Sequence, residues 1–337
     1  MGLKKLKAIS LFVALFIVAS AAQGLEAGFK LEAFVDAERD RPISIDLWYP
    51  TLADAVGTYH YGLGTGRAIE AADIAPGKFP LIMLSHGALG APRNYSWIAE
   101  ALARRGYVVA GVAHFGESYV FGPETVDARA VLRSWERPLD VSAAIDFMLT
   151  RSTLAESIIT QQIGFVGHSS GGATGLYLAG VQFEYQKMTD YCNSAQAAGD
   201  RGCDYAQKVT LDLDKIVTGG NYQDERISVF TILDPALGPG FTNFSAIDAT
   251  ILIVGSVEND FLPFEHHAQL VANKLPMVTT HWLKEGAGHF VYLNQCQRNV
   301  TANGVPLCID QPSVSRENVH INLKKHIGEF IDSGFTQ

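Results

Sequence analysis

The stretch IGFVGHSSGGA, at residues 163–173, decides the fold that we expect for this chain. It begins with a short apolar run, typical of a buried strand, and a glycine-rich turn and a helical pattern follow directly. The turn has the pattern G-x-S-x-G, which is informative where a strand precedes it and a helix follows. A turn this tight brings positions 167 and 171 close together, so both positions need a small residue, and both are glycine. Ser169, exposed at the turn, is therefore the first candidate for a reactive side chain.

Apolar, β-branched runs alternate with helical patterns on both sides of this turn. Strands are expected at residues 43–49, 79–85, 107–112, 163–166, 227–233, 249–254 and 278–283. Helices are expected at residues 95–105, 137–150, 172–179 and 315–332. This alternation predicts an α/β fold, in which a mostly parallel sheet carries helices on both faces. Residues 51–78 are rich in Gly and Ala, and we expect them to be irregular.

Residues 1–24 have the three parts of a secretory signal peptide. Lys4, Lys5 and Lys7 precede an apolar run at residues 8–22, which ends in small residues. A membrane span needs about 20 apolar residues, more than this run provides. We therefore expect cleavage, a single domain over residues 25–337, and a secreted or periplasmic protein with no stable membrane span.

The charge of the chain argues against nucleic acid as a partner. The sequence has 26 Lys and Arg against 35 Asp and Glu, and losing the three lysines of the signal would change the net charge from −9 to −12. The chain also lacks a cluster of basic residues that would bind the phosphates of a nucleic-acid backbone. We expect the acidic surface to serve solubility.

Four cysteines in an exported chain indicate disulfides. Three pairings are possible, and we prefer the local one, Cys192–Cys203 with Cys296–Cys308, which closes two short loops. No C-x-x-C or histidine spacing accompanies them, so a metal site is not expected. The first pair lies in residues 182–226, a polar stretch that breaks the strand–helix alternation. We interpret this stretch as an inserted cap beside the active serine.

A serine hydroxyl is a poor nucleophile until a base takes its proton. The base should lie on the loop after the last strand. Of the ten histidines, only His289 does so, in a glycine-rich loop at residues 285–290. We therefore predict His289 as the base. We expect His168 to pack inside the turn and His86 to support loop geometry. His266 and His267 are expected to be solvated.

Three carboxylates compete to be the acid that fixes the imidazole tautomer and stabilises the imidazolium. In chain order, the acid should lie between the nucleophile and the base. Asp260 follows the strand at 249–254, just before an expected helix, and is preferred. Asp234, at the end of the preceding strand, is the second candidate, and Glu258, in the same loop as Asp260, is the third.

Two backbone N–H groups are expected to hold the negative charge that develops on the substrate oxygen. One belongs to Ser170, directly after the nucleophile. The other belongs to Ala88, after the strand at 79–85, where Gly87 permits a turn that aims it inward. Losing one such donor costs about 2.7–4 kcal/mol in known enzymes. This chemistry needs no metal and no organic cofactor.

Three segments together resemble a known family: PLIMLSHG at residues 80–87, GHSSGGA at 167–173 and GHF at 288–290. They are similar to the bacterial dienelactone-hydrolase-like proteins related to plasma platelet-activating-factor acetylhydrolase. The similarity runs from near residue 28 to the C-terminus, and PLCID at 306–310 also fits the bacterial group. The resemblance implies an α/β-hydrolase fold with Ser169 and His289 catalytic, and with Ala88 and Ser170 as oxyanion donors.

Two departures limit what the resemblance transfers. True dienelactone hydrolases use a cysteine nucleophile, so their substrate does not transfer to a chain with Ser169. The acetylhydrolases resemble this chain at Asp234, where they place their acid. Polyester hydrolases and cutinases resemble it at Asp260 instead. The resemblance therefore leaves both aspartates open.

The expected reaction is hydrolysis of a small-molecule or lipid-like carboxylic ester through an acyl-enzyme. Short or medium acyl chains are expected, because the irregular segments at 51–78 and 182–226 would crowd the site. Acyl transfer to an alcohol on the same residues is the alternative reaction. A degenerate hydrolase that acts as a binding protein is the alternative without catalysis. The sequence indicates no particular oligomeric state.

Overall fold

The computed structural model describes residues 24–336 except 56, 208–219, 246 and 303. The predicted signal peptide, residues 1–24, lies outside this range apart from Gly24. Across the described residues, we find no helix with the length and apolar character needed to cross a membrane.

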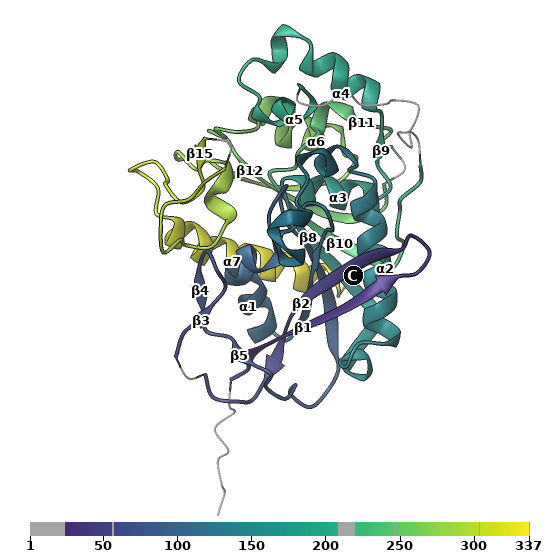
Figure 1. Cartoon of the computed structure of the whole chain (residues 1–337), viewed down its shortest axis with the longest axis vertical. Helices are drawn as coiled ribbons and strands as arrows, with labels where there is room; N and C mark the ends of the chain where they lie inside the picture. The colour runs from purple at the N-terminus through teal and green to yellow at the C-terminus, as the bar shows by residue number, and fades with distance from the viewer. Residues whose placement is uncertain (1–23, 56, 208–219, 246, 303, 337) are drawn as a thin grey trace, which may run out of the picture.

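The described residues form a central nine-stranded sheet in the order β13-β12-β10-β8-β6-β7-β2-β1-β5 (Figure 1). In chain order, its strands are β1 (Glu26–Asp36), β2 (Arg41–Thr51), β5 (Ile69–Glu70), β6 (Phe79–Ser85), β7 (Val108–Ala113), β8 (Ile158–His168), β10 (Ile227–Leu233), β12 (Thr250–Ser256) and β13 (Thr279–Leu283). All neighbours from β13 to β7 are parallel, whereas β2 runs antiparallel to both β7 and β1. The predicted α/β fold, with a mostly parallel sheet, is confirmed.

Helices cover both faces of the sheet. On one face lie α2 (Glu136–Thr150), α3 (Ser170–Leu178) and α6 (Ala268–Lys274), and on the other lie α1 (Ser96–Arg104) and α7 (Arg316–Gly334). Strand β6 shows why its sequence is continuously apolar. Leu81 and Met83 pack against the first set of helices, and Ile82 and Leu84 against the second, because successive side chains of a strand point to opposite faces.

The first strand was not expected from the sequence. β1 pairs with β2 along its whole length, from Glu26 opposite Thr51 to Asp36 opposite Arg41. Its outer half faces solvent, and Leu31 and Val35 are each 54% exposed. A half-exposed edge region lacks the apolar run that marks the central strands. The irregular region at 51–78 contains, besides β5, only the two-residue strands β3 (Tyr59–His60) and β4 (Thr65–Gly66) among its described residues.

Both expected disulfides are present, with Cα–Cα separations of 5.5 Å. Cys192–Cys203 joins the end of α4 (Tyr185–Cys192) to the turn before α5 (Asp204–Gln207), which lie together at the top of Figure 1. Cys296–Cys308 closes the loop that carries β14 (Thr301–Ala302) and β15 (Val305–Pro306). In the cap segment, β9 (Gln182–Phe183) pairs with β11 (Phe241–Thr242). Two disulfides are consistent with an exported protein.

Candidate active site

Ser169 lies in a strained turn between β8 and α3, with φ 57° and ψ −117°. Such a backbone conformation is costly for a residue with a side chain and persists only where its surroundings hold it. Its N–H donates to Leu233 O at 2.9 Å, on the neighbouring strand β10. A Cβ at Gly167 would lie 2.2 Å from Gly171 O, and one at Gly171 would lie 2.0 Å from Ser85 O. The two glycines are therefore required by close backbone contact, as the sequence pattern predicts.

His289 lies next to this serine, on the 3-10 turn that follows β13. Its Nε2 is 2.9 Å from Ser169 Oγ, and both residues are buried. The ring of Phe261 stacks on the imidazole, with centroids 5.2 Å apart. Burial lowers the pKa of His289 well below its ordinary value, and nearby His168 and His267 add to this effect. The imidazole is therefore neutral at pH 7 and able to accept a proton from the serine.

Asp234, which follows β10, faces the other nitrogen of this imidazole. Its Oδ2 lies 3.9 Å from His289 Nδ1, and among the described residues it has no hydrogen-bond partner. Its Oδ1 accepts a hydrogen bond from Ser256 N–H at 2.8 Å. Burial raises the pKa of Asp234 to about 7, although Ser256, Tyr292 and Asn259 oppose this rise. The free carboxylate oxygen therefore points toward the ring of the base.

Asp260 contacts the backbone of His289 and not its ring. Its Oδ1 accepts a hydrogen bond from the His289 N–H at 2.8 Å. Glu258 is exposed, and no ion pair or hydrogen bond joins it to His289 among the described residues. Between the two acids lies Asn259, whose Nδ2 is 3.2 Å from His289 Nδ1. Sequence reasoning considered both neighbours of Asn259 but missed the amide, because only acids were considered for that position.

The two expected oxyanion donors lie beside the nucleophile. Ala88 and Ser170 both line the space in front of Ser169, and within the described part of the chain neither backbone N–H has a hydrogen-bond partner. The loop that bears Ala88 is held by Tyr95, whose hydroxyl accepts a hydrogen bond from Gly87 N–H at 3.0 Å. The same hydroxyl contacts His168 Nδ1 at 2.8 Å. The sequence predicts only that His168 packs inside the turn, and the structure shows that it also supports the geometry of this loop through Tyr95.

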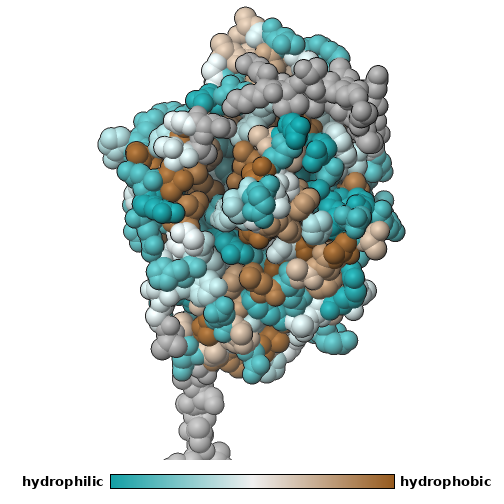
Figure 2. All heavy atoms as spheres, in the orientation of Figure 1, coloured by the Kyte–Doolittle hydropathy of each residue, from teal (hydrophilic) through white to brown (hydrophobic). Residues whose placement is uncertain are grey.

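Two compartments meet at Ser169. The wide one has a volume of about 460 Å³ and includes His289, Tyr95, Tyr119, Phe290 and Arg298 in its wall. The narrow one has a volume of about 60 Å³ and is largely apolar, with Leu132, Met188, Leu237 and Leu262 in its wall. Figure 2 shows hydrophobic residues exposed beside the loop of β15, on the side of the wide compartment. Met188, Cys192 and Gly202, from α4 and the loop closed by Cys192–Cys203, also line the narrow compartment.

His267 also lines the narrow compartment, and here the sequence expectation was wrong. It was expected to be solvated but is 1% exposed. Its Nε2 lies 2.7 Å from Asp200 Oδ2, a buried carboxylate in the loop closed by Cys192–Cys203. Gly238 N–H approaches its other nitrogen at 3.3 Å. His267 therefore joins the cap segment to the body of the fold.

Comparisons with known proteins agree with this architecture. Residues 52–129 match the sequence profile of the family described as platelet-activating factor acetylhydrolase, isoform II. No curated protein sequence matches the chain. Among 655 matching chains of solved structure is a ferulic acid esterase from Streptomyces cinnamoneus. It has a TM-score of 0.63 and 20% sequence identity, over 94% of this chain and 92% of that chain.

The order of the sheet, the serine turn and the structural match show that the chain has the α/β-hydrolase fold. Residues 52–129 resemble the platelet-activating factor acetylhydrolases of isoform II. So many unrelated activities share this fold that the substrate must be argued from the site itself.

Proposed function

We propose that the chain hydrolyses carboxylic esters through an acyl-enzyme on Ser169, with His289 as the base. The 2.9 Å contact between His289 Nε2 and Ser169 Oγ carries this proposal. His289 takes the serine proton as Oγ attacks the ester carbonyl, and the N–H groups of Ala88 and Ser170 hold the oxyanion. His289 then gives the proton to the leaving alcohol. Water, activated by the same imidazole, attacks the acyl-enzyme and releases the acid.

We assign the acid of this triad to Asp234 and not to Asp260, the candidate that the sequence favoured. Asp234 has a buried, unpartnered oxygen facing His289 Nδ1 among the described residues, whereas Asp260 is engaged with the backbone N–H of His289. The separation of 3.9 Å is long for a hydrogen bond. Catalytic hydrogen bonds are often long without substrate and shorten in the complex. In this structure, the amide Nδ2 of Asn259 lies 3.2 Å from His289 Nδ1.

The walls of the two compartments indicate how an ester is oriented. The leaving oxygen must lie within reach of His289, which protonates it. His289 lines the wide compartment and not the narrow one, whereas the oxyanion donor Ser170 lines only the narrow one. The alcohol therefore occupies the wide compartment, and the acyl chain extends past the oxyanion donors into the narrow one.

The difference in volume then sets the substrate class. The narrow compartment has a volume of about 60 Å³ against about 460 Å³ for the wide one, so the acyl side takes the smaller group. The preferred substrate is therefore an ester of a short acid, from acetyl to about butyryl, with a bulky and partly apolar alcohol. A short acyl group agrees with the matched family's description as an acetylhydrolase. The structural relative is instead an esterase of ferulic acid, which is a larger aromatic acid.

We also propose that the protein is exported, with residues 1–24 as a cleaved signal. The two disulfides support this proposal because such bonds persist in oxidising compartments. We further propose that the rest of the chain forms one domain, in which the described parts of the insertion, residues 182–207 and 220–226, act as a cap over the acyl compartment. Residues 208–219 of this insertion lie outside the described residues.

Two series of esters test this orientation. With one alcohol and acids from acetate to octanoate, kcat/KM should fall by about 10-fold or more beyond butyrate, because overfilling a packed space costs about 1–3 kcal/mol. With acetate as the acid and alcohols from methyl to naphthyl, kcat/KM should stay level or rise. Equal activity on octanoate and acetate would contradict the orientation. Added alcohols that divert the product from acid to ester would indicate acyl transfer instead.

Met188→Ala should widen the acyl compartment. Met188 lies on α4 of the cap and lines the narrow compartment but not the wide one. We expect the ratio of kcat/KM for hexanoate to that for acetate to rise about 10-fold, the effect of one or two methylenes in an apolar pocket. Leu307→Ala, in the wall of the wide compartment, is the matched control and should leave this ratio unchanged. An equal shift in both variants would show that Met188 of the cap does not select the acyl chain.

A further inference from the structure

A buried ion pair lies behind the loop that carries Ala88, and the mechanism above does not use it. Arg137, in the first turn of α2, binds Glu117 through Nε to Oε1 at 2.8 Å and Nη2 to Oε2 at 2.7 Å. Each residue is 2% exposed. Burial opposes ionisation of Glu117, but the adjacent charge and hydrogen bonds of Arg137 outweigh it and lower the pKa of the carboxyl. The pair is therefore ionised although it is removed from water.

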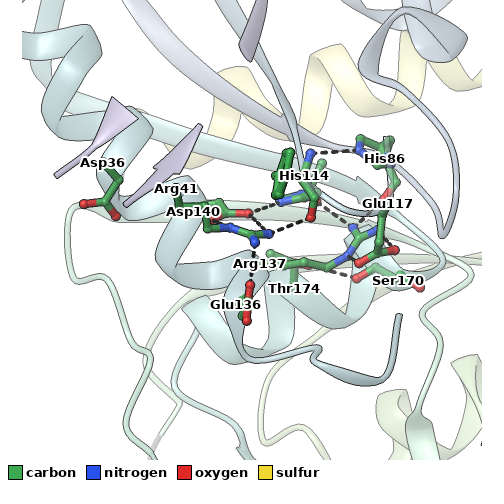
Figure 3. Close-up of polar contacts among 12 residues, drawn as sticks. Asp36, Arg41, His86, His114, Glu117, Glu136, Arg137, Asp140, Ser170 and Thr174 are labelled. Atoms are coloured by element: carbon green, nitrogen blue, oxygen red, sulfur yellow. Dashed lines mark hydrogen bonds and ion pairs between the residues drawn. The ribbon is translucent and has the colours of Figure 1, made fainter. Parts of the chain in front are cut away.

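The pair contacts the oxyanion loop on both sides of Ala88. Before it, Arg137 Nη1 donates to His86 O at 2.7 Å and lies 3.4 Å from Ser85 Oγ. After it, the backbone of Leu89 also acts on Glu117, because it contributes to the lowered pKa of that carboxyl. Figure 3 shows Arg137 and Glu117 side by side, close to His86 and Ser170. Neither residue of the pair lines either compartment, so neither is positioned to touch the substrate.

A second arm of polar contacts holds the start of the same loop (Figure 3). His114 Nδ1 lies 2.9 Å from Asp140 Oδ2, and its Nε2 lies 2.9 Å from Ser85 Oγ. Burial lowers the pKa of His114 to about 4, so the ring is neutral. The pKa of Asp140 is lowered to about 2 despite its burial, because His114 and Arg41 stabilise the carboxylate. His114 therefore donates a hydrogen bond through Nδ1 to Asp140 and accepts one at Nε2 from the Ser85 hydroxyl.

Within the loop, one backbone hydrogen bond, from Gly90 N–H to Gly87 O at 3.2 Å, spans Ala88 and Leu89, and the side-chain contacts add to it. Gly87 and Gly90 flank Ala88 and Leu89, and Leu89 has a φ of 55°, a conformation that few side-chain residues adopt. An oxyanion donor must be held within about 0.5 Å of its productive position. A buried ion pair is weak evidence of stability in itself, because the cost of desolvation offsets the attraction. Its contacts on both sides of Ala88 give it another use.

We propose that Glu117 and Arg137 are positioning residues that hold the Ala88 N–H where the oxyanion of the transition state forms. This inference rests on the proposed ester hydrolysis at Ser169. The pair acts through the backbone of the loop and makes no contact with the substrate. Its contribution belongs to the transition state, because negative charge develops on the oxygen only as the tetrahedral intermediate forms.

Glu117→Gln tests the proposal, since the amide keeps the shape and removes the charge that holds Arg137. Losing an oxyanion donor entirely costs about 10²–10³ in kcat, so a displaced donor should cost about 10- to 100-fold, with KM within about threefold. A boronic acid, which adds to Ser169 Oγ to form a tetrahedral boronate, should lose affinity by the same factor. The affinity for the product alcohol should not change.

Asp46→Asn is the matched control. Asp46 is 1% exposed and paired in bidentate fashion with Arg93 at 2.8 and 3.1 Å, and it lies on β2, outside the network around residues 85–89. It should lower Tm but leave kcat and boronate affinity near those of the parent. Arg137→Lys retains a buried cation but loses the planar guanidinium that binds both Glu117 oxygens and His86 O, so it should act in the same direction as Glu117→Gln.

The outcomes separate the two proposals. If Glu117→Gln and Arg137→Lys lower only Tm, as Asp46→Asn does, the pair is structural and the positioning role is wrong. If the parent protein neither hydrolyses esters nor binds the boronic acid, the proposed function itself fails. A loss of kcat that is matched by the loss of boronate affinity, with unchanged KM, supports the positioning role.

Discussion

Replacing Ser169 with alanine is expected to lower the turnover of a simple ester such as p-nitrophenyl acetate by about 10⁶, the loss found for comparable triads. The reason is that Oγ is the atom that forms the acyl-enzyme, and His289 has no other hydroxyl at 2.9 Å from its Nε2 among the described residues. The residual rate should come from the oxyanion donors and from substrate binding alone. Steady-state kinetics on purified protein measure this loss.

Covalent labelling gives an independent readout of the same change. A fluorophosphonate should add to Ser169 of the folded protein in a one-to-one ratio, detected by mass spectrometry of the labelled peptide. The Ser169→Ala variant should take up no label. Ser142→Ala, at a serine of α2 whose hydroxyl donates to Asp224, controls for the loss of a hydroxyl elsewhere. Appreciable ester hydrolysis by Ser169→Ala would mean that another group is the nucleophile.

The elements that bring these residues together follow from local sequence pattern. β6 and β10 lie where their apolar runs predict, because both faces of those strands are largely buried and most of their side chains are apolar. The serine turn follows from two glycines whose Cβ atoms would collide with backbone. β1 escaped notice because its outer half is exposed, so its pattern mixes charge with apolar residues.

The identity of the acid is a different kind of question. Asp234 and Asp260 each follow a strand of the same sheet. Asp234 lies 3.9 Å from the ring of His289, whereas Asp260 accepts a hydrogen bond from the His289 N–H. Which one faces the ring depends on the direction of a single side chain at each strand end. Sequence pattern places the strands but does not orient such side chains. The pair Arg137 and Glu117 was missed for a related reason, because no motif joins the start of α2 to the loop that carries Glu117.

Replacing Asp234 with asparagine is expected to lower turnover by about 10⁴, as an aspartate-to-asparagine change does in a comparable triad. The amide can no longer stabilise the imidazolium that forms when His289 takes the serine proton. Asp260→Asn is the matched comparison. Its amide oxygen can still accept the hydrogen bond from His289 N–H, so turnover should stay within about 10-fold of the parent. The reverse order of effects would assign the acid to Asp260.

The pH profile of kcat/KM distinguishes a triad acid from a carboxylate that merely supports the loop. Burial raises the pKa of Asp234 to about 7 and lowers that of His289 well below its ordinary value. The active form needs Asp234 ionised, so kcat/KM of the parent should rise with pH through about 7, with the protonation of His289 limiting activity only at lower pH. Asp260→Asn should retain this rise. Asp234→Asn should lose this rise together with most of the activity, because the group that titrates near pH 7 is gone. If the rise of kcat/KM persists in Asp234→Asn, it belongs to another group.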